Sequence, residues 1–318
     1  MSCFCCNFVY LGIGVVAIYY LLKRYARGGQ YTKNTTIDNK VVIITGANAG
    51  IGKANAIDLA KRGGKIYIAC RDKTRGENAL NDIRKQSGSD KVYFLPLDLA
   101  SLKSIREFSN KFHQLENKLD ILINNAGLLC HNRSLTEDGF EMHMGVNHLG
   151  HFLLTNLLLD LLKAAAPSRI VVVSSRANEM HRFDKDDIMT EKNYSAFKAY
   201  AMSKIANILF SKELAERLKG TKVTVNSCHP GVVQTEIVKG WSFSLMDIIS
   251  YIFMKFGKTP MEGAQTQIRL AVDPELETVT GKYFSDCNVS KTSPDADDSE
   301  IAKWLWMKSS ELVKLNKE

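Results

Sequence analysis

The stretch Lys40-Val-Val-Ile-Ile-Thr-Gly-Ala-Asn-Ala-Gly-Ile-Gly-Lys53 decides how this chain of 318 residues folds. Residues 41–44 form a continuous run of β-branched apolar side chains, which is typical of a parallel strand buried on both faces. Gly46, Gly50 and Gly52 follow at once, and a helical pattern begins at Ile51. The order is therefore a strand, a glycine turn and a helix.

Glycines in such a turn let the backbone bend sharply and approach a pyrophosphate, which the free N–H groups of the following helix can hold. The spacing Gly-x-x-x-Gly-x-Gly differs from the common Gly-x-Gly-x-x-Gly fingerprint and indicates one particular family of dinucleotide-binding folds. Taken alone, the glycines are equally consistent with an ordinary strand-to-helix turn. The prediction of a dinucleotide site therefore depends on motifs further along the chain.

The composition indicates one large folded domain. With 45% hydrophobic residues, 21 glycines and only six prolines, the chain can form a single α/β domain with a full core. The 42 basic residues exceed the 34 acidic ones, but they are scattered and lack the stripe of a nucleic-acid binder. We interpret them as solvated surface, with attraction to anionic lipid as a further contribution. The seven cysteines show no metal-ligand spacing in the body of the chain, which favours a reducing compartment.

The N-terminal segment has the features of a membrane anchor. Residues 4–22 carry no charge and, at about 1.5 Å per helical residue, reach across most of a bilayer core. Lys23, Arg24 and Arg27 follow directly, whereas a secretory signal places its basic cluster first. We expect residues 1–27 to be an uncleaved anchor with its basic flank, 28–39 a linker, and 40–318 a cytosolic domain. A shallow insertion or a buried helix is the alternative.

Beyond the glycine turn, strand patterns alternate with helical patterns. This alternation specifies a single Rossmann-type, doubly wound parallel sheet of about seven strands, flanked by helices. The expected helices cover residues 51–62, 74–86, 101–115, about 137–165 and about 196–218. The expected further strands cover residues 66–69, 92–97, 119–124, 170–174 and 223–228, before a variable segment and the closing helices and short strand.

Arg71 stands just after the second strand, where dinucleotide folds read the adenosine ribose. Arginine at this place favours the 2′-phosphate of NADP, whereas an acidic residue accepts hydrogen bonds from the ribose of NAD. Asp72 comes later in the loop and keeps NAD as an alternative. Lys53 is either a second positive charge for the phosphate or a solvated residue of the helix.

Tyr200 and Lys204 lie four residues apart on one expected helix, so their side chains leave the same face. A phenol, with an ordinary pKa of about 10, exchanges protons near neutrality only when neighbouring positive charge favours the phenolate. Ser174 and Ser175 end the fifth strand, at the edge where open α/β sheets bind ligands, and one hydroxyl can hold a substrate carbonyl. Asn147 lies in an apolar helix, so we expect its amide to be hydrogen-bonded.

Taken in order, these motifs resemble the short-chain dehydrogenase/reductases from about Asp38 to the C-terminus. The resemblance rests on Thr45 to Gly52, Asn124-Asn-Ala-Gly127, Asn147, Ser175, Tyr200-Ala-Met-Ser-Lys204 and Pro230-Gly231. Other stretches are similar to the NADP-preferring, membrane-anchored retinol dehydrogenases, among them Ala69-Cys-Arg-Asp72, Gly145-Val-Asn-His-Leu-Gly-His-Phe-Leu-Leu154 and His229-Pro-Gly-Val232. Ala201-Met202 departs from the Cys-His pair common in that subgroup, which leaves the exact substrate open.

The resemblance implies a role for each matching residue. Tyr200 would be the general acid/base, Lys204 would lower its pKa and bind ribose, Ser175 would position the carbonyl, and Asn147 would hold a water of the proton relay. Cofactor contacts would come from Thr45, Gly46, Asn48, Gly50, Ile51, Gly52, Arg71, Asp98, Asn125, Ala126, Gly127, Tyr200, Lys204, Pro230, Gly231, Val233 and Thr235.

These observations together predict an NADP(H)-dependent oxidoreductase acting on a lipophilic aldehyde, ketone or alcohol, with retinal and retinol as first candidates. The alternatives are a broader reductase of steroid or lipid-derived carbonyls and a catalytically idle interaction protein of a membrane or lipid droplet. Residues 241–256 lie where the family has its substrate lid, and either rest on the bilayer or pack on the core. The resemblance implies the endoplasmic reticulum first, with mitochondrial membrane or lipid droplet as alternatives, and pairing through the two long helices.

Overall fold

The computed structural model describes residues 23, 27–234 and 257–315. The expected anchor at residues 4–22, the expected lid at residues 241–256 and Thr235 lie outside these residues. Within them, no helix is both long enough and apolar enough to cross a membrane.

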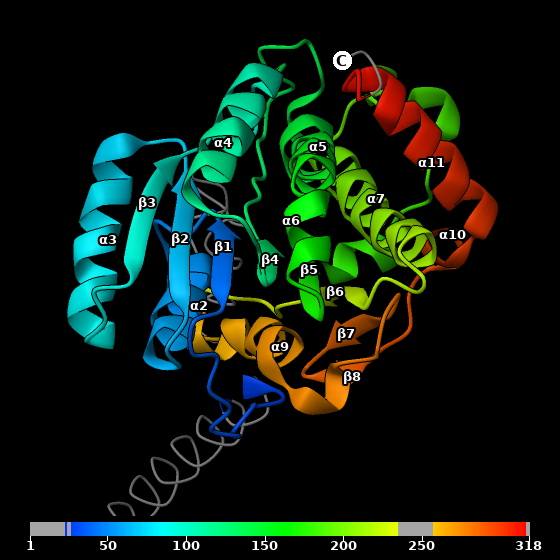
Figure 1. Cartoon of the computed structure of the whole chain (residues 1–318). Coiled ribbons are helices and arrows are strands. Elements are labelled where there is room, and N and C mark those ends of the chain that lie inside the picture. The colour runs from blue at the N-terminus through cyan, green and yellow to red at the C-terminus, as the bar shows by residue number, and fades with distance from the viewer. Residues whose placement is uncertain (1–22, 24–26, 235–256, 316–318) are drawn as a thin grey trace, which may run out of the picture.

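One sheet of eight strands organises the molecule, in the order β3-β2-β1-β4-β5-β6-β7-β8 (Figure 1). All neighbouring pairs are parallel except β7 and β8, which are antiparallel. The strands are β1 (Val41–Thr45), β2 (Lys65–Cys70), β3 (Val92–Pro96), β4 (Ile121–Asn124), β5 (Ser168–Val173), β6 (Val223–His229), β7 (Tyr283–Ser285) and β8 (Asn288–Val289). The expectation of a doubly wound parallel sheet is confirmed, with one short strand more than expected.

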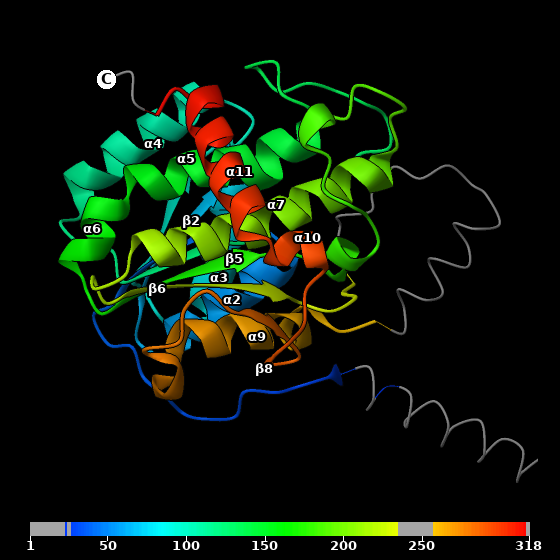
Figure 2. The same ribbon diagram turned by 90° about the vertical axis from the view of Figure 1, so that its right-hand side faces the viewer.

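Helices cover both faces of the sheet (Figure 2). One face carries α2 (Gly50–Lys61), α3 (Lys73–Ser87) and α9 (Pro260–Val272). The other carries α4 (Leu102–Leu115), α5 (Gly150–Leu157), α6 (Leu159–Ala164), α7 (Ala196–Arg217) and α11 (Ser299–Leu312), with α10 (Pro294–Asp297) leading into α11. Because β1 pairs with both β2 and β4, the chain reverses its direction across the sheet beside β1, which is where such folds bind ligands.

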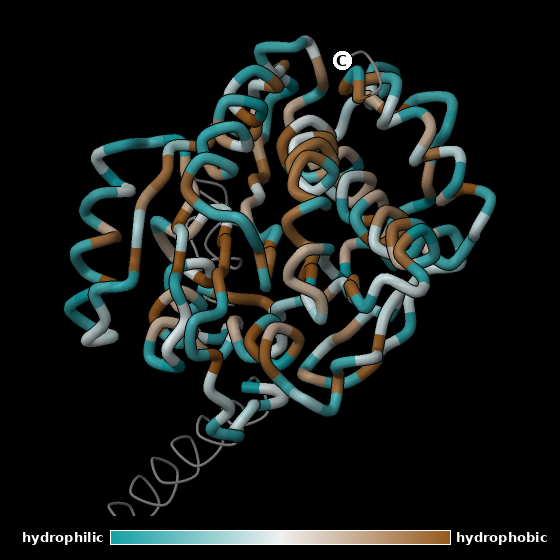
Figure 3. The backbone as a smooth tube through the Cα atoms, viewed as in Figure 1, coloured by the Kyte–Doolittle hydropathy of each residue, from teal (hydrophilic) through white to brown (hydrophobic). Residues whose placement is uncertain are grey.

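The alternation of side chains along each strand builds two separate cores. Val41 and Ile43 point to the cluster beneath α4, α5 and α7, whereas Val42 and Ile44 point to the cluster beneath α2 and α9. Both clusters take residues from nearly every parallel strand, which explains why the strands read as unbroken apolar runs. The helices turn their hydrophilic residues outward, most clearly along α3 (Figure 3).

The expected long helix over residues 137–165 is wrong at its start and in its continuity. Residues around Leu135 and Glu141 form a bridged turn, in which Gly139 has a φ of +83°. The Glu141 carboxylate then accepts the backbone N–H of Met144 at 2.9 Å. A π-helix follows over Met144–Leu149, and a break at Leu158 separates α5 from α6. Apolar periodicity alone did not reveal the polar turn or the wider π-helix.

The segment expected as a linker runs along the body of the protein. Arg27 forms an ion pair with Glu262 at 2.7 Å, and the backbone N–H of Tyr31 donates to the side chain of Gln265 at 2.9 Å. Tyr31 and Ile37 are buried. These contacts attach Arg27 and Tyr31 to α9.

Candidate active site

The glycine turn after β1 is tightly packed. Gly46 has a φ of +66°, and a Cβ on it would come within 2.8 Å of the Cα of Ala126. A Cβ on Gly52 would come within 2.5 Å of the carbonyl oxygen of Gly46. The turn therefore admits only glycine at these two positions, because a side chain would collide with the neighbouring backbone atoms. Without side chains, the backbone of the turn can also approach a ligand closely.

The N-terminus of α2 differs from those of the other long helices. Its N-cap residue, Ala49, offers no side-chain hydrogen bond, and its first turn holds no acidic residue. Each of the other helices α3, α4, α7, α9 and α11 is capped by a side chain, namely Asp72, Ser101, Ser195, Thr259 and Asp298. A helix N-terminus without a side-chain cap, preceded by a glycine turn, fits the pyrophosphate of a dinucleotide.

Thr45 ties the end of β1 to the loop after β4. Its Oγ1 accepts the backbone N–H groups of Asn125 and Ala126, both at 2.9 Å. The side chain of Asn125 donates back to the carbonyl oxygen of Thr45 at 2.9 Å. Three residues expected to line the cofactor are thus brought together beside Gly46 and Gly52.

Tyr200, Lys204 and Ser175 meet at the carboxyl end of β5. Ser195 caps α7, which then carries Tyr200 and Lys204 one turn apart. The Nζ of Lys204 lies 5.5 Å from the centroid of the Tyr200 ring, and the Ser175 hydroxyl forms a hydrogen bond with the Tyr200 phenol. The three side chains that the sequence placed on separate elements therefore form one constellation.

The ammonium of Lys204 is buried, with only 2% of the residue exposed. It donates to the carbonyl oxygen of Val173 at 3.1 Å, and burial lowers its pKa to about 8. A Cβ on Gly127 would lie 3.3 Å from this Nζ, so the absence of a side chain there leaves room beside the ammonium. A buried ammonium has three donors, which fits the hydroxyl groups of a ribose.

The pKa of Tyr200 departs from the expected direction. Burial raises it above its ordinary value, and the hydrogen bond from Ser175 opposes this rise only in part. Lys204 faces the ring of Tyr200, with its Nζ 5.5 Å from the ring centroid. In the protein alone the effect of burial on the phenol pKa prevails, so a lowered pKa needs further positive charge near the phenol oxygen.

Asn147 is fully buried in the π-helix, and its amide is hydrogen-bonded as expected. Its Oδ1 accepts the backbone N–H of Leu128 at 2.9 Å. Its Nδ2 donates to the Leu128 carbonyl oxygen at 3.2 Å and to the Ser203 hydroxyl at 3.0 Å. Because both amide hydrogens are engaged, a relay water would have to donate to an Asn147 oxygen.

Arg71 and Asp98 lie together at the far end of the site, beside β2 and β3. The Arg71 Nε is 3.9 Å from a carboxylate oxygen of Asp98, and 73% of the Arg71 side chain is exposed. Asp98 also accepts the backbone N–H of Ala100 at 2.9 Å. The two residues expected at the adenosine end of the cofactor are thus neighbours.

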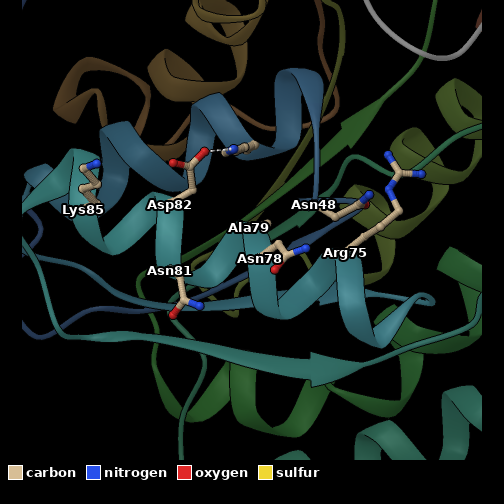
Figure 4. A pocket seen from close by; sticks show the side chains of 8 residues that line it. Asn48, Arg75, Asn78, Ala79, Asn81, Asp82 and Lys85 are labelled. Carbon is tan, nitrogen blue, oxygen red and sulfur yellow. Dashed lines mark hydrogen bonds and ion pairs between the residues drawn. The ribbon is translucent and has the colours of Figure 1, made fainter.

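A hollow of about 450 Å³ opens between α2 and α3, next to the glycine turn (Figure 4). Figure 4 shows Asn48 and Arg75 at one end and Asp82 and Lys85 at the other. Lys53 forms an ion pair with Asp82, so the structure places this lysine toward the outer end. Arg75 was not predicted from the sequence, although it stands four residues after Arg71, in the first turn of α3.

The loop after β6 approaches the glycine turn from the other side. Gly231 has a φ of +91°, and a Cβ on it would press on the side chain of Lys258. Val233 is buried and pairs with Lys258 in an isolated bridge. A Cβ on Gly263 would meet Val233 at 2.6 Å and Ile51 at 3.4 Å, so these three residues lie side by side. Val233 is therefore near α2, as its expected cofactor role requires, and Pro230 and Gly231 precede it in the same loop.

Ala201 and Met202, which replace the Cys-His pair common in the retinol dehydrogenases, lie inside the protein. Ala201 and Met202 are both fully buried, and Met202 packs in the core beneath α4, α5 and α7. The Met202 sulfur also accepts the backbone N–H of Asp184 at 3.3 Å. These two residues affect the packing of α7, so their difference from the subgroup says little about the substrate.

Comparisons with known proteins agree with this geometry. A family model described as short chain dehydrogenase matches residues 40–243. Human retinol dehydrogenase 13 is 50% identical over 301 residues, covering 93% of this chain and 91% of its own length. Human retinol dehydrogenase 12 is 48% identical over 292 residues, covering 92% of both proteins.

Solved structures share the fold. A protein from Mycobacterium paratuberculosis superimposes with a TM-score of 0.73 and 31% identity, covering 90% of this chain and 98% of its own. A short chain dehydrogenase from Escherichia coli, solved with NADPH, has a TM-score of 0.64 and 22% identity, covering 81% of this chain and 100% of its own. The chain therefore belongs to the short-chain dehydrogenase family, as an oxidoreductase of the retinol dehydrogenase subgroup that uses an NAD(P)-type cofactor.

Proposed function

We propose that this enzyme uses NADP(H) to interconvert a lipophilic aldehyde or ketone and its alcohol, with retinal and retinol as the first substrates to test. The observation that carries this proposal is the meeting of Ser175, Tyr200 and Lys204 beside the glycine turn. The names of the relatives, retinol dehydrogenases at 48 to 50% identity, support the substrate class. The broader alternative is a reductase of steroid or lipid-derived carbonyls.

The residues around the turn would hold the cofactor along its length. Arg71 and Asp98 would receive the adenosine end, the turn from Gly46 to Gly52 the pyrophosphate, and Lys204 the nicotinamide ribose. When bound, the reduced nicotinamide supplies a hydride and the oxidised form accepts one, and the oxidised ring also brings a positive charge. Val233 would contact the nicotinamide end.

The side chains of the protein would carry out the proton transfer. In the reductive direction Ser175 would donate a hydrogen bond to the substrate carbonyl oxygen, and Tyr200 would give that oxygen its phenolic proton. Tyr200 would then recover a proton through Lys204, the ribose and a water held at an Asn147 oxygen. In the oxidative direction the same groups act in reverse, with the phenolate taking the alcohol proton.

The preference for NADP is supported by positive charge near the adenosine end. Arg71 is largely exposed after β2, and Arg75 and Asn48 line the adjoining hollow (Figure 4). Arginine pairs well with a phosphate, because its planar guanidinium offers several donors. Asp98 accepts from its own loop and lies beside Arg71, so it would meet the adenine side of the cofactor.

The test is cofactor turnover in membranes that carry the full-length chain. Wild-type protein and the Tyr200→Phe variant would be given NADPH or NADH with retinal, steroid ketones and medium-chain aldehydes. We expect NADPH oxidation by the wild type to be fastest with retinal and absent in the variant. Turnover of no carbonyl despite tight NADPH binding would contradict the proposal and favour the idle interaction protein.

We also propose attachment to the endoplasmic reticulum membrane through residues 1–27, with the catalytic domain in the cytosol. The uncharged stretch and its basic flank support this arrangement, and the ion pair between Arg27 and Glu262 would hold the domain close to the bilayer. Alkaline extraction of isolated membranes tests it. Release of the full chain into the soluble fraction would argue against an integral anchor.

Pairing of two copies remains a prediction, and the structure limits where it can occur. Trp306 of α11 contacts Phe152 of α5 with ring centroids 4.9 Å apart and Phe210 of α7 at 6.0 Å. α11 therefore covers the groove between the two helices through which the family commonly pairs. Light scattering of the purified protein gives the number of copies, and a cross-link between α5 helices of two copies would require α11 to move.

A further inference from the structure

His151 of α5 bridges two parts of the active site that are distant in the sequence. Its Nε2 lies 2.8 Å from the Oγ1 of Thr45, the last residue of β1. Its Nδ1 lies 3.0 Å from the backbone carbonyl oxygen of Asn147 in the π-helix. At most 1% of each of these three residues is exposed. One buried ring thus joins the strand that enters the glycine turn to the residue expected to hold the relay water.

The two contacts fix the protonation of the ring. A carbonyl oxygen cannot donate, so Nδ1 must carry a hydrogen toward Asn147. Burial keeps the imidazole of His151 neutral by lowering its pKa to about 4, which leaves Nε2 as an acceptor. The hydroxyl of Thr45 must therefore donate to Nε2. This assigns one tautomer to His151 throughout the neutral pH range.

The direction of the Thr45 hydroxyl matters to the cofactor loop. Its oxygen already accepts the N–H groups of Asn125 and Ala126. Its hydrogen goes to the His151 Nε2 at 2.8 Å, because the other acceptor in reach, the Ile123 carbonyl oxygen, is farther away at 3.4 Å. With the hydrogen held by the imidazole, the oxygen lone pairs stay aimed at the two amides. Those amides begin the loop that leads to Gly127, beside the ammonium of Lys204.

The other end of the bridge acts on the π-helix. π-helical turns are rare in proteins, but those that occur are often found at functional sites. There the helix presents a residue differently from a regular α-helix. The side-chain amide of Asn147 bonds to Leu128 and Ser203, while His151 binds its main-chain carbonyl. Side chain and main chain of Asn147 are thus held from separate directions.

We propose that His151 is a positioning residue that couples the cofactor turn, through Thr45, to the π-helix that presents Asn147. The proposal rests on the proposed function for the role of Asn147, but its Thr45 end concerns only the binding of the nicotinamide cofactor. Loss of that end loosens the loop from Asn125 to Gly127 and weakens cofactor binding. Loss of the Asn147 end leaves the cofactor bound and slows the proton relay.

Two substitutions separate the two ends. In His151→Asn the short amide reaches the place of Nδ1 and keeps the bond to the Asn147 carbonyl, but leaves Thr45 only the more distant Ile123 carbonyl oxygen as an acceptor. In His151→Gln the longer amide reaches the place of Nε2 and keeps the acceptor for Thr45, but loses the bond to Asn147. Calorimetric titration with NADPH gives the Kd, and retinal reduction gives kcat.

We expect His151→Asn to raise the Kd for NADPH about fivefold or more while kcat stays within about twofold. We expect His151→Gln to lower kcat about fivefold or more while the Kd stays within about twofold. Thr45→Val removes the first bond together with the acceptor of the Asn125 and Ala126 N–H groups, so adding His151→Asn to it should raise the Kd little beyond Thr45→Val alone. Should His151→Asn fail to fold, His151→Gln still tests the proposal, because it should lower kcat and leave the Kd unchanged.

Ser309→Ala is the matched control. It removes a buried bond from His148 on the same π-helix, where the His148 Nε2 lies 2.9 Å from the Ser309 hydroxyl of α11. This variant should melt at a lower temperature with unchanged Kd and kcat. Equal changes of Kd and kcat in both His151 variants, or no change in either, would overturn the proposal. If the wild type binds NADPH but reduces no carbonyl, the proposed function fails while the Kd comparison still tests His151.

Discussion

At the scale of residues, Arg71 should decide between the two cofactors. Replacing it with aspartate removes a positive charge near the 2′-phosphate and adds a group that accepts hydrogen bonds from a ribose. We expect Arg71→Asp to lower kcat/KM with NADPH about 100-fold and with NADH less than threefold, because a charged hydrogen bond is worth about 1.5 to 3 kcal/mol. Lys73→Asp changes the net charge equally two residues away and should affect both cofactors little. Equal loss with both cofactors in Arg71→Asp would reject the assignment.

The positions of the catalytic residues were predictable from the sequence, and their electrostatics were not. The spacing of Tyr200 and Lys204 and the position of Ser175 after a strand were enough to predict that they meet. The sequence says nothing about where Lys204 points, and in the structure it faces the tyrosine ring and the Val173 carbonyl. His151 was missed because a histidine in an apolar helix has no partner visible in the sequence.

The lowered pKa of Lys204 predicts a pH dependence of cofactor binding. Its ammonium loses a proton as the pH rises through about 8, and a neutral amine attracts the oxygen atoms of the cofactor less strongly. NADPH affinity measured by calorimetry should therefore fall between pH 7 and pH 9. Lys204→Met cannot titrate, so it should bind NADPH more weakly and lack this fall. The same fall in the variant would assign it to another group.

At the scale of elements, strands and capped helices were predictable and irregular turns were not. Runs such as Val41 to Ile44 mark strands covered on both faces, and Ser101 marks the start of a helix whose cap the structure contains. Asp72 caps α3 and was not predicted as a cap. The π-helix at Met144–Leu149 escaped prediction because its apolar side chains follow the same pattern as an α-helix. The two residues of β8 are too few to show any period.

Packing of α11 should contribute strongly to stability through Trp306. Its ring contacts Phe152 and Phe210, and the Arg217 guanidinium lies 4.4 Å from its centroid. Trp306→Ala should lower the free energy of unfolding in urea by about 3 kcal/mol, because it leaves a cavity between aromatic rings. Met307→Ala, at a position that is 62% exposed, should change it by less than about 0.5 kcal/mol. Similar losses in both variants would contradict this role for Trp306.

The buried histidines predict sensitivity to acid. Burial lowers the pKa of His148 to about 3 and of His151 to about 4, so the unfolded chain binds more protons than the folded protein below about pH 6.5. Stability should therefore decrease as the pH falls from 6.5 to 4. Urea unfolding at pH 7 and pH 5 measures the decrease, and His148→Gln should reduce it. An equal decrease in wild type and variant would exclude His148 as a cause.

At the scale of the whole molecule, the alternation of strands and helices predicted the doubly wound sheet. The site lies where the strand order reverses, beside β1. Arg27 and Tyr31 attach the chain ahead of β1 to α9, through Glu262 and Gln265. These two residues therefore keep a set position relative to the sheet.

Four exposed sequons report the orientation of the domain. Asn34, Asn132, Asn193 and Asn288 all begin Asn-x-Ser/Thr sequences and are exposed. In a cytosolic domain they stay bare, whereas a lumenal domain would present them to glycosylation. We expect no change of gel mobility after treatment of the cellular protein with an endoglycosidase. A shift toward lower mass would place the domain in the lumen.

Direct hydride transfer tests the central claim most closely. NADPH deuterated at C4 of the nicotinamide, on either face in separate reactions, would be incubated with retinal and membranes carrying the full-length protein. Mass spectrometry should find deuterium in retinol from one of the two cofactors and none with Tyr200→Phe. Retinol without deuterium from both cofactors, or equal labelling by the variant, would contradict hydride transfer at the Ser175, Tyr200 and Lys204 site.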